Sequence, residues 1–275
     1  MQKDDLFSKA PYRRFAEFIS PEADRFTLLC SVLNECSLPW QILKIEGKRH
    51  IAVPALPVQG ALSGIFTAHY DRTPQSPGAN DNGAAVFQLI ETAHRILKSP
   101  NTGAPVLFIF TDGEELSRGE SLRHQGSYGL GLYLKKNRLG NSPVFSFDAC
   151  GTGDTLIIST TAVELLKNEN AAGAETARQK VRTLRRRALE AARQARLEKV
   201  LLLPTPFSED AGFLLAGMAA QTITVLPQSE TTLVHQRLIP ETWKNLNGPS
   251  DSLQKLTPEH WKKLSAFAGV LAEEH

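Results

Sequence analysis

Short apolar runs alternate with polar clusters along the chain, and the runs have the lengths of buried strands and amphipathic helices. Residues 64–68 and 106–111 are almost continuously apolar, which is typical of strands buried on both faces. Between them, apolar side chains recur at helical spacing at Val86, Leu89, Ile90, Ala93, Ile96 and Leu97. This order of strand, helix and strand predicts a βαβ unit within a parallel sheet.

Polar residues gather at the ends of these elements. His69 and Asp71 follow the first strand, and residues 112–115 follow the second. Asp81 and Asn82 stand where the helix should begin, and we expect them to cap it because both residue types cap helices well. Ligands of open α/β sheets bind outside the carboxyl ends of the strands, so we expect a site at this edge.

The rest of the chain predicts a mixed order of strands and helices. Strands are expected at 41–45, 49–53, 143–147, 155–159 and 221–226. Helices are expected at 11–37, 126–136, 161–199 (with a break near 171–173), 208–217 and 257–271. Residues 227–250 are predicted to be a long polar connection. Together the elements predict an α/β fold: one domain spanning 1–275, a three-layer α/β/α sandwich with a mixed, mainly parallel central sheet.

Composition places the chain among ordinary globular proteins. It has 275 residues, of which 41% are hydrophobic and 22% charged, and a formal net charge of +2. That charge gives no general attraction to nucleic acid or anionic membranes, and no apolar stretch is long enough to span a bilayer. The first residues lack the apolar core of a signal peptide, and three cysteines do not make a disulfide framework. We therefore expect a cytoplasmic protein without nucleic-acid or membrane partners; the oligomeric state is left open.

One segment departs from this even charge. Residues 178–199 carry nine basic and two acidic side chains, with an apolar stripe of small residues between them. The segment could be a nucleic-acid or membrane patch, or a solvated helix that docks by its stripe. The second interpretation is favoured, because no aromatic residues are interleaved with the charges and the total charge is nearly neutral.

The polar clusters point to a metal. One imidazole and several carboxylates at adjoining strand ends suit a borderline divalent cation such as zinc. A carboxylate can bridge two such ions, and the adjacent Glu114 and Glu115 can divide the roles of general base and ligand. Each motif alone is common in turns and on surfaces. Their succession at predicted strand ends favours a functional site.

Three of these motifs carry a specific resemblance. They are His69-Tyr70-Asp71, Gly78-Ala79-Asn80-Asp81-Asn82-Gly83 and Glu114-Glu115. In this order they resemble the co-catalytic two-zinc aminopeptidases of the bacterial leucyl aminopeptidase type, whose one-zinc relatives are the glutaminyl cyclases. The resemblance extends over roughly residues 60 to 260 and implies a zinc exopeptidase fold of the phosphorylase/hydrolase-like kind. It implies a peptide substrate.

The resemblance also implies a role for each site residue. The implied metal ligands are His69, Asp81, Glu115 and Asp148. One zinc ion would be held by the imidazole and by Asp148, a second by Glu115, and Asp81 would bridge them. Asp71 would orient His69, and Glu114 would take a proton from the attacking water and pass it to the leaving amine. Ser208 and Glu209 are expected to support these ligands.

The last part of the family pattern is altered in this chain. The family has a histidine four residues before an aspartate, but Asn247 stands four residues before Asp251. An amide oxygen is a poor zinc ligand beside a neutral imidazole, so the metal at Glu115 is predicted to be held weakly. His235, the nearest upstream histidine, could complete that site or be an ordinary loop residue. The expected content is one or two zinc ions per chain.

These features favour a zinc-dependent aminopeptidase that hydrolyses N-terminal residues from peptides. One alternative is a glutaminyl-cyclase-like acyltransferase on the same scaffold; the other is a weakly active or inactive binding protein with a peptidase fold. The presence of both His69 and Glu114 favours the peptidase, whereas Asn247 favours the binding protein. The polar residues 117–125 could be a lid over the site or a tolerated surface insertion.

Overall fold

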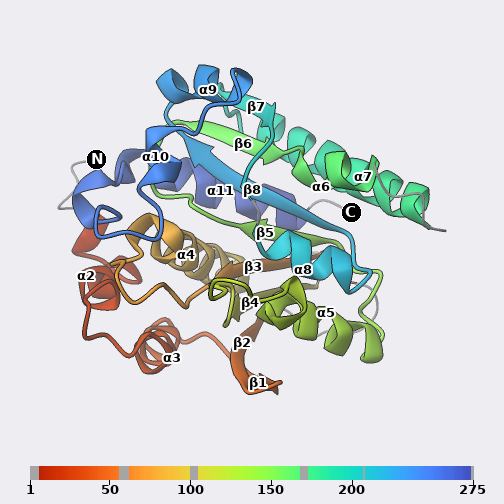
Figure 1. Cartoon of the computed structure of the whole chain (residues 1–275). Helices are drawn as coiled ribbons and strands as arrows, with labels where there is room; N and C mark the ends of the chain where they lie inside the picture. The colour runs from red at the N-terminus through yellow and green to blue at the C-terminus, as the bar shows by residue number, and fades with distance from the viewer. Residues whose placement is uncertain (1–5, 56–61, 100–104, 168–172, 207, 274–275) are drawn as a thin grey trace.

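A computed structural model of the chain describes residues 6–55, 62–99, 105–167, 173–206 and 208–273 (Figure 1). Its centre is an eight-stranded sheet in the order β1-β2-β4-β3-β5-β8-β6-β7. The strands are β1 (Gln41–Ile45), β2 (Lys48–Pro54), β3 (Gly64–His69), β4 (Val106–Thr111), β5 (Val144–Phe147), β6 (Thr155–Ser159), β7 (Val200–Leu203) and β8 (Ala220–Leu226). The four central strands β4, β3, β5 and β8 are mutually parallel, which confirms the predicted mixed, mainly parallel sheet.

Helices cover both faces of the sheet (Figure 1). On one face lie α2 (Phe15–Phe18), α3 (Arg25–Glu35), α4 (Ala84–Lys98), α7 (Ala174–Gln194) and α11 (Trp261–Glu273). On the other face, α5 (Gly126–Lys136) packs against α8 (Glu209–Leu215). Because the central strands are apolar on both sides, each face has its own apolar core.

The predicted βαβ unit is present as β3, α4 and β4, and the three central strands are tied together by aromatic packing. The ring of Phe66 on β3 lies 5.4 Å from that of Phe108 and 5.7 Å from that of Phe145, measured between centroids. These pairs fix the relative heights of β4, β3 and β5. The strands therefore end at the same level of the sheet.

The predicted start of α4 was wrong. The helix begins at Ala84, and Asp81 and Asn82 lie in the preceding turn η2 (Ala79–Gly83), where their backbone is not helical. Neither side chain caps the helix; Gly83 occupies the cap position. The carboxylate of Asp81 points instead toward the edge of the sheet, where it contacts His69.

Two further expectations were incomplete. Residues 227–250 are not an unstructured connection: they contain α9 (Gln228–His235) and α10 (Glu241–Lys244). These helices are short and bury few side chains, so their hydrophobic pattern is weak. Strand β7 was not predicted either: its apolar run, residues 200–203, ends at Pro204 but follows the long helical region directly, and only Leu203 is fully buried.

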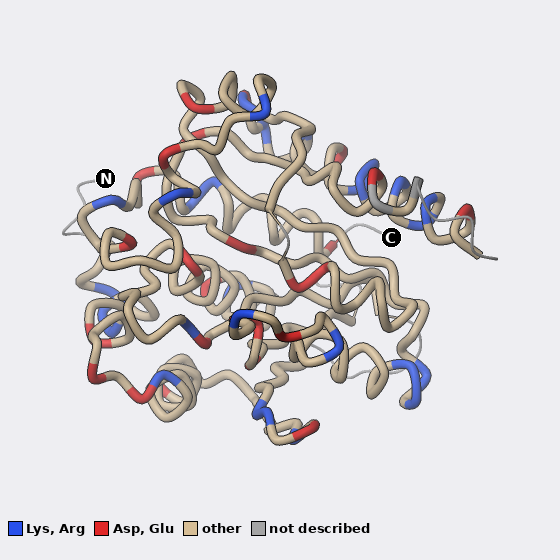
Figure 2. The backbone as a smooth tube through the Cα atoms, viewed as in Figure 1, with Lys and Arg blue, Asp and Glu red and all other residues tan. Residues whose placement is uncertain are grey.

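The basic segment forms most of α7, preceded in the chain by α6 (Thr161–Lys167). Val181, Leu184 and Ala188 are buried, so the helix docks by the predicted apolar stripe. Figure 2 shows Lys and Arg along this helix. Several of these groups have intramolecular partners: Arg187 donates to the main-chain oxygen of Ser63, for example. No helix in the described part of the chain is long and apolar enough to cross a membrane.

Candidate metal centre

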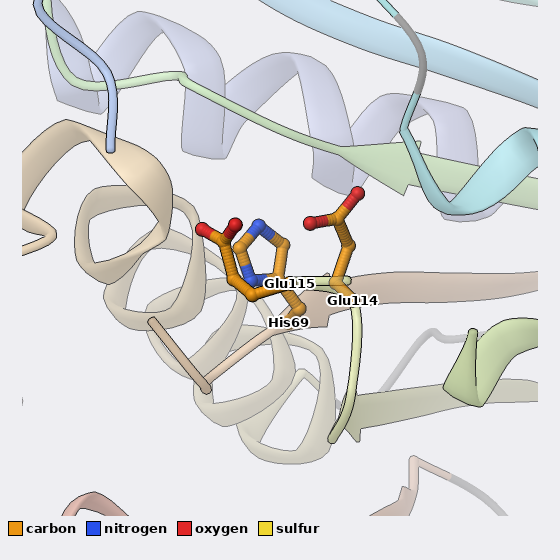
Figure 3. A group of neighbouring side chains, drawn as sticks. All are labelled: His69, Glu114 and Glu115. Atoms are coloured by element: carbon orange, nitrogen blue, oxygen red, sulfur yellow. The ribbon is translucent and has the colours of Figure 1, made fainter. Parts of the chain in front are cut away.

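The parallel strands bring the predicted site residues to one edge of the sheet. His69 is the last residue of β3, Asp148 follows β5 directly, and Glu114 and Glu115 follow β4 by three and four residues. His69 pairs in register with Thr111, the last residue of β4. Figure 3 shows the three side chains of His69, Glu114 and Glu115 projecting to the same side of the strand ends.

A first group of potential ligands consists of His69, Asp81 and Asp148. The imidazole Nε2 lies 3.0 Å from Asp81 Oδ1 and 3.6 Å from Asp148 Oδ1. One ligand atom from each of the three residues lies within 4.8 Å of the others. His69 is fully buried, and Asp81 is 6% exposed. The group therefore offers one nitrogen and two carboxylates as potential ligands in a compact, largely buried space.

A second group shares the same imidazole. His69, Glu114 and Glu115 also place ligand atoms within 4.8 Å of one another. Asp71 supports both sides of this group: its Oδ1 lies 3.5 Å from Nδ1 of His69, and its Oδ2 accepts a hydrogen bond from the Glu115 backbone N–H at 3.0 Å. Asp71 is thus placed to orient the ring and the segment that carries Glu115.

The hydrogen-bonding pattern of these residues fits a divalent cation. Both ring nitrogens of His69 and one oxygen each of Asp71 and Asp148 are buried without a hydrogen-bond partner among the described residues. Buried polar atoms without partners are costly, so a group that satisfies several of them at once would stabilise the site. Neutral imidazole and carboxylates are ligands that zinc accepts.

The same crowding changes the acidity of the ligands. Burial opposes the charge on His69, but the facing carboxylates of Asp148, Asp71 and Asp81 raise the pKa of the imidazole well above its usual value. Burial, together with the charge of Asp81, raises the pKa of Glu115 to about 8. Without a cation, the cluster therefore keeps protons at neutral pH, and a bound cation would displace them.

The Asn-Asp-Asn motif is held by hydrogen bonds on each side of Asp81. The Asp251 carboxylate accepts from the backbone N–H of Asn80 at 2.7 Å and from that of Asp81 at 2.9 Å. Asn82 donates from its side chain to the Phe147 carbonyl at 2.8 Å, which ties the turn to the end of β5. The motif therefore aligns Asp81 with Asp148 rather than starting a helix.

A buried arginine that no local sequence pattern marks holds the neighbouring loop. Arg25 on α3 is 5% exposed and donates to the main-chain oxygens of Tyr70 (3.1 Å), Pro77 (2.6 Å) and Gly78 (2.9 Å). Burial and the nearby Arg72 lower its pKa to about 9. Its guanidinium thereby fixes both ends of the loop between the His-x-Asp and Asn-Asp-Asn motifs.

Glu209 contacts the strands whose ends carry the cluster. It is fully buried at the start of α8 and accepts hydrogen bonds from Thr67 on β3 at 3.1 Å and from Thr111 on β4. Burial raises its pKa to about 7. Ser208, beside it, lines a cavity of about 120 Å³ next to Asp81, Glu114 and Asp148. The other walls of this cavity come from Ala149, Thr205, Pro206, Thr222, Thr224, Trp243, Leu246 and Asn247.

Asn247 lies at the position where the family resemblance places a histidine. With its NH2 group toward Glu115, its amide donates to Oε1 at 2.5 Å and to Oε2 at 3.0 Å. For an ionised Glu115 this orientation is required, because the opposite one would place oxygen against oxygen. His235 is exposed at the end of α9 and belongs to neither ligand group. In this structure Asn247 therefore contacts the Glu115 carboxylate, and His235 lies in neither group of potential ligands.

Comparison with known proteins relates the chain to peptidases. The sequence pattern of peptidase family M28 matches residues 56–237. The probable lipoprotein aminopeptidase LpqL of Mycobacterium tuberculosis is 38% identical over 89 residues, and aminopeptidase YwaD of Bacillus subtilis is 40% identical over 87 residues. These matches cover 30% and 31% of this chain, and the chain covers only 18% of the length of each relative.

Solved structures share the fold. The Legionella pneumophila aminopeptidase LapA superimposes with a TM-score of 0.68 at 15% identity, covering 95% of this chain and 69% of that one. For the Porphyromonas gingivalis glutaminyl cyclase the TM-score is 0.67 at 15% identity, covering 94% of each chain. The zinc aminopeptidase BSAP of Bacillus subtilis gives 0.59 at 22% identity, covering 81% of this chain and 49% of that one. At these identities the likeness establishes the fold alone.

We predict that replacing Arg25 destabilises the protein and weakens metal binding. Arg25→Met leaves the main-chain oxygens of the loop without their donor, which should lower the free energy of unfolding by about 3 kcal/mol. Denaturant unfolding and zinc content after dialysis measure both effects. Arg13→Met is the control, because Arg13 pairs with Glu35 at the surface and should matter little. Normal stability and normal zinc content in Arg25→Met would show that Arg25 does not hold the loop.

We also predict that the metal-free protein loses stability as pH rises from about 6.5 to 8. The raised pKa values of Glu209 and Glu115 mean that the folded state holds protons that the unfolded chain has lost, so rising pH favours unfolding. His50, whose pKa burial lowers to about 4, opposes this trend only at lower pH.

Melting temperature across this pH range measures the effect, which should be on the order of 5 °C. Zinc should stabilise more at pH 8 than at pH 6.5, since its ligands must lose their protons. Glu209→Gln should reduce the dependence of melting temperature on pH in the metal-free protein, whereas Glu198→Gln, at an exposed position, should not. A melting temperature that rises with pH in the metal-free protein would contradict the prediction.

Proposed function

The chain belongs to peptidase family M28, and we propose that it is a zinc-dependent aminopeptidase that removes N-terminal residues from peptides. The observation that carries the proposal is the buried group of His69, Asp81 and Asp148 with the Glu114 carboxylate beside it. The group supplies a cation site, and Glu114 supplies a base within the same cavity.

Each residue has a distinct task in this proposal. His69, Asp81 and Asp148 hold the zinc ion, and Asp71 orients the imidazole from its Nδ1 side. When bound, zinc polarises the scissile carbonyl and lowers the pKa of a water molecule. Glu114 takes a proton from the attacking water and delivers it to the amine of the leaving peptide.

The size and charge of the site favour an N-terminal residue as the target. The cavity of about 120 Å³ beside the ligands is small compared with pockets for whole drug-sized ligands, and it suits a single side chain. Its acidic side, formed by Asp81, Glu114 and Asp148, is complementary to the ammonium group of a peptide N-terminus.

The two ligand groups are proposed to bind metal unequally. The first group has a buried imidazole and two carboxylates, whereas Glu115 of the second group is hydrogen-bonded by the Asn247 amide. A metal ion at Glu115 would have to displace that hydrogen bond and would gain no nitrogen ligand from Asn247. One zinc ion is held firmly, and a second ion is held weakly or with partial occupancy.

The contact between Asn247 and Glu115 also favours a second candidate, a glutaminyl-cyclase-like acyltransferase that works with one zinc ion. Asn247 leaves one strong ligand group, and the fold also resembles that of the Porphyromonas gingivalis glutaminyl cyclase. A panel of aminoacyl-anilides tested beside a peptide with N-terminal glutamine separates the two activities. Release of the anilide supports the peptidase, and cyclisation without hydrolysis supports the cyclase. Zinc binding without either activity would support the alternative of a binding protein with a peptidase fold.

We predict that Glu114→Gln lowers turnover of aminoacyl-anilides by about 10³-fold, because the amide cannot accept the proton. Zinc content and melting temperature should stay unchanged. Glu115→Gln should instead reduce the content of the weakly held metal. The surface substitution Glu259→Gln serves as the control for loss of a carboxylate. Near wild-type turnover in Glu114→Gln would show that the general base has been assigned wrongly.

Substitution at Asn247 tests the unequal sites. Asn247→His supplies an imidazole beside Glu115, so metal per chain after dialysis should rise from about one toward about two, and peptidase activity should increase. His235→Ala should change neither quantity. Elemental analysis of the wild type and both variants gives the answer. Two tightly held ions in the wild type, with one lost in His235→Ala, would overturn this assignment.

A further inference from the structure

The polar segment after Glu115 ends in a buried residue that contacts the general base. Ser117 to His124 are exposed and include the short helix η3 (Leu122–His124), but Gln125 is only 3% exposed. Its side-chain Nε2 donates to Glu114 Oε1 at 3.1 Å. No second side-chain hydrogen bond to this carboxylate occurs among the described residues.

The Gln125 amide is held at both ends. Its Oε1 accepts a hydrogen bond from Ser127 Oγ at 2.9 Å, so its NH2 group is turned toward Glu114. The reverse orientation would place the amide oxygen against the Glu114 carboxylate. The amide therefore joins Glu114 to the Ser127 hydroxyl at the start of α5.

Two glycines allow this arrangement to form. The Gly126 N–H donates to the Gly113 carbonyl at 2.8 Å, and a Cβ atom on Gly126 would lie 1.8 Å from the Asp112 carbonyl oxygen. A Cβ atom on Gly212 of α8 would lie 2.1 Å from Ser127 Oγ and 2.7 Å from Gln125 Oε1. The start of α5 thus packs directly on the backbone that carries Glu114, and α8 closes it from the other side.

We infer that Gln125 is a positioning residue for Glu114: it holds one carboxylate oxygen in place and leaves the other oxygen to accept the proton. This inference rests on the proposed function, because Glu114 is the base of that reaction. A glutamate side chain has several rotatable bonds, and proton transfer requires its oxygen within hydrogen-bond reach of the proton. Holding the base in that geometry before the substrate arrives favours the chemical step.

The inference also assigns a role to the polar segment after Glu115. Its first part, Ser117 to His124, is exposed, whereas its last residue contacts the site. Whether the exposed part acts as a lid is a separate prediction, since the contact between Gln125 and Glu114 does not depend on it. A shorter segment would have to keep an amide donor before Gly126 to keep the base in place.

The test is Gln125→Met, which keeps much of the length of the side chain and removes its donor. We expect kcat to fall about 10- to 100-fold while KM stays within about twofold, because the substrate-binding walls of the cavity are unchanged. Zinc content should be unaltered. Gln221→Met is the matched control: Gln221 is also fully buried and donates to main-chain oxygens, but it does not touch Glu114. The control should lower the melting temperature and leave kcat unchanged.

A double substitution makes the assignment specific. In a Glu114→Gln background, Gln125→Met should cause no further loss of kcat, because the residue acts through Glu114. Independent, multiplying losses would overturn the inference, and so would a wild-type kcat in Gln125→Met. In both cases the proposed function would stand if the wild type hydrolyses aminoacyl-anilides. A zinc-bound wild type without turnover would overturn both the function and this role of Gln125.

Discussion

Mutual repulsion among closely spaced, partly buried carboxylates is the constraint to which the rest of this structure responds. Asp81, Glu114, Glu115 and Asp148 surround one fully buried imidazole at the edge of the sheet. Buried charges of one sign destabilise a fold unless opposite charges or hydrogen bonds compensate them. Here the compensation comes from the His69 imidazole, whose pKa is raised, from backbone donors and from the nearby Arg25, and a bound cation would add to it.

The supporting contacts have a common form: each ties one site-bearing loop to a distant part of the chain. Arg25 secures the loop after β3, Asp251 secures the turn that carries Asp81, and Gln125 reaches Glu114 from the start of α5. Because each loop has its own anchor, the ligand positions depend on several elements at once. The geometry of the centre is therefore a property of the whole fold and not of the motifs alone.

The sequence predicts those parts of the protein whose signal is local. Strands β3, β4 and β5 are continuous apolar runs because both faces of the sheet are covered, and the site motifs follow them within a few residues. Helices α9 and α10 bury few residues and leave little pattern to detect. The contact between Arg25 and Gly78 joins residues 53 positions apart, and no local pattern marks such a partner. The amide–carboxylate contact of Asn247 depends likewise on how a distant loop folds back.

Several residues that hold the site loops lie outside the part of the chain that matches the family. The family pattern covers residues 56–237, whereas Arg25, Asn247 and Asp251 lie outside it. The recognisable core therefore contains the reactive side chains but lacks several groups that hold them. For protein engineering, this means that the motifs alone are not sufficient. Moving them into another sheet would transfer the site residues without the groups that hold them in place. A successful graft would have to include α3, which carries Arg25, and the segment before α11, which carries Asn247 and Asp251.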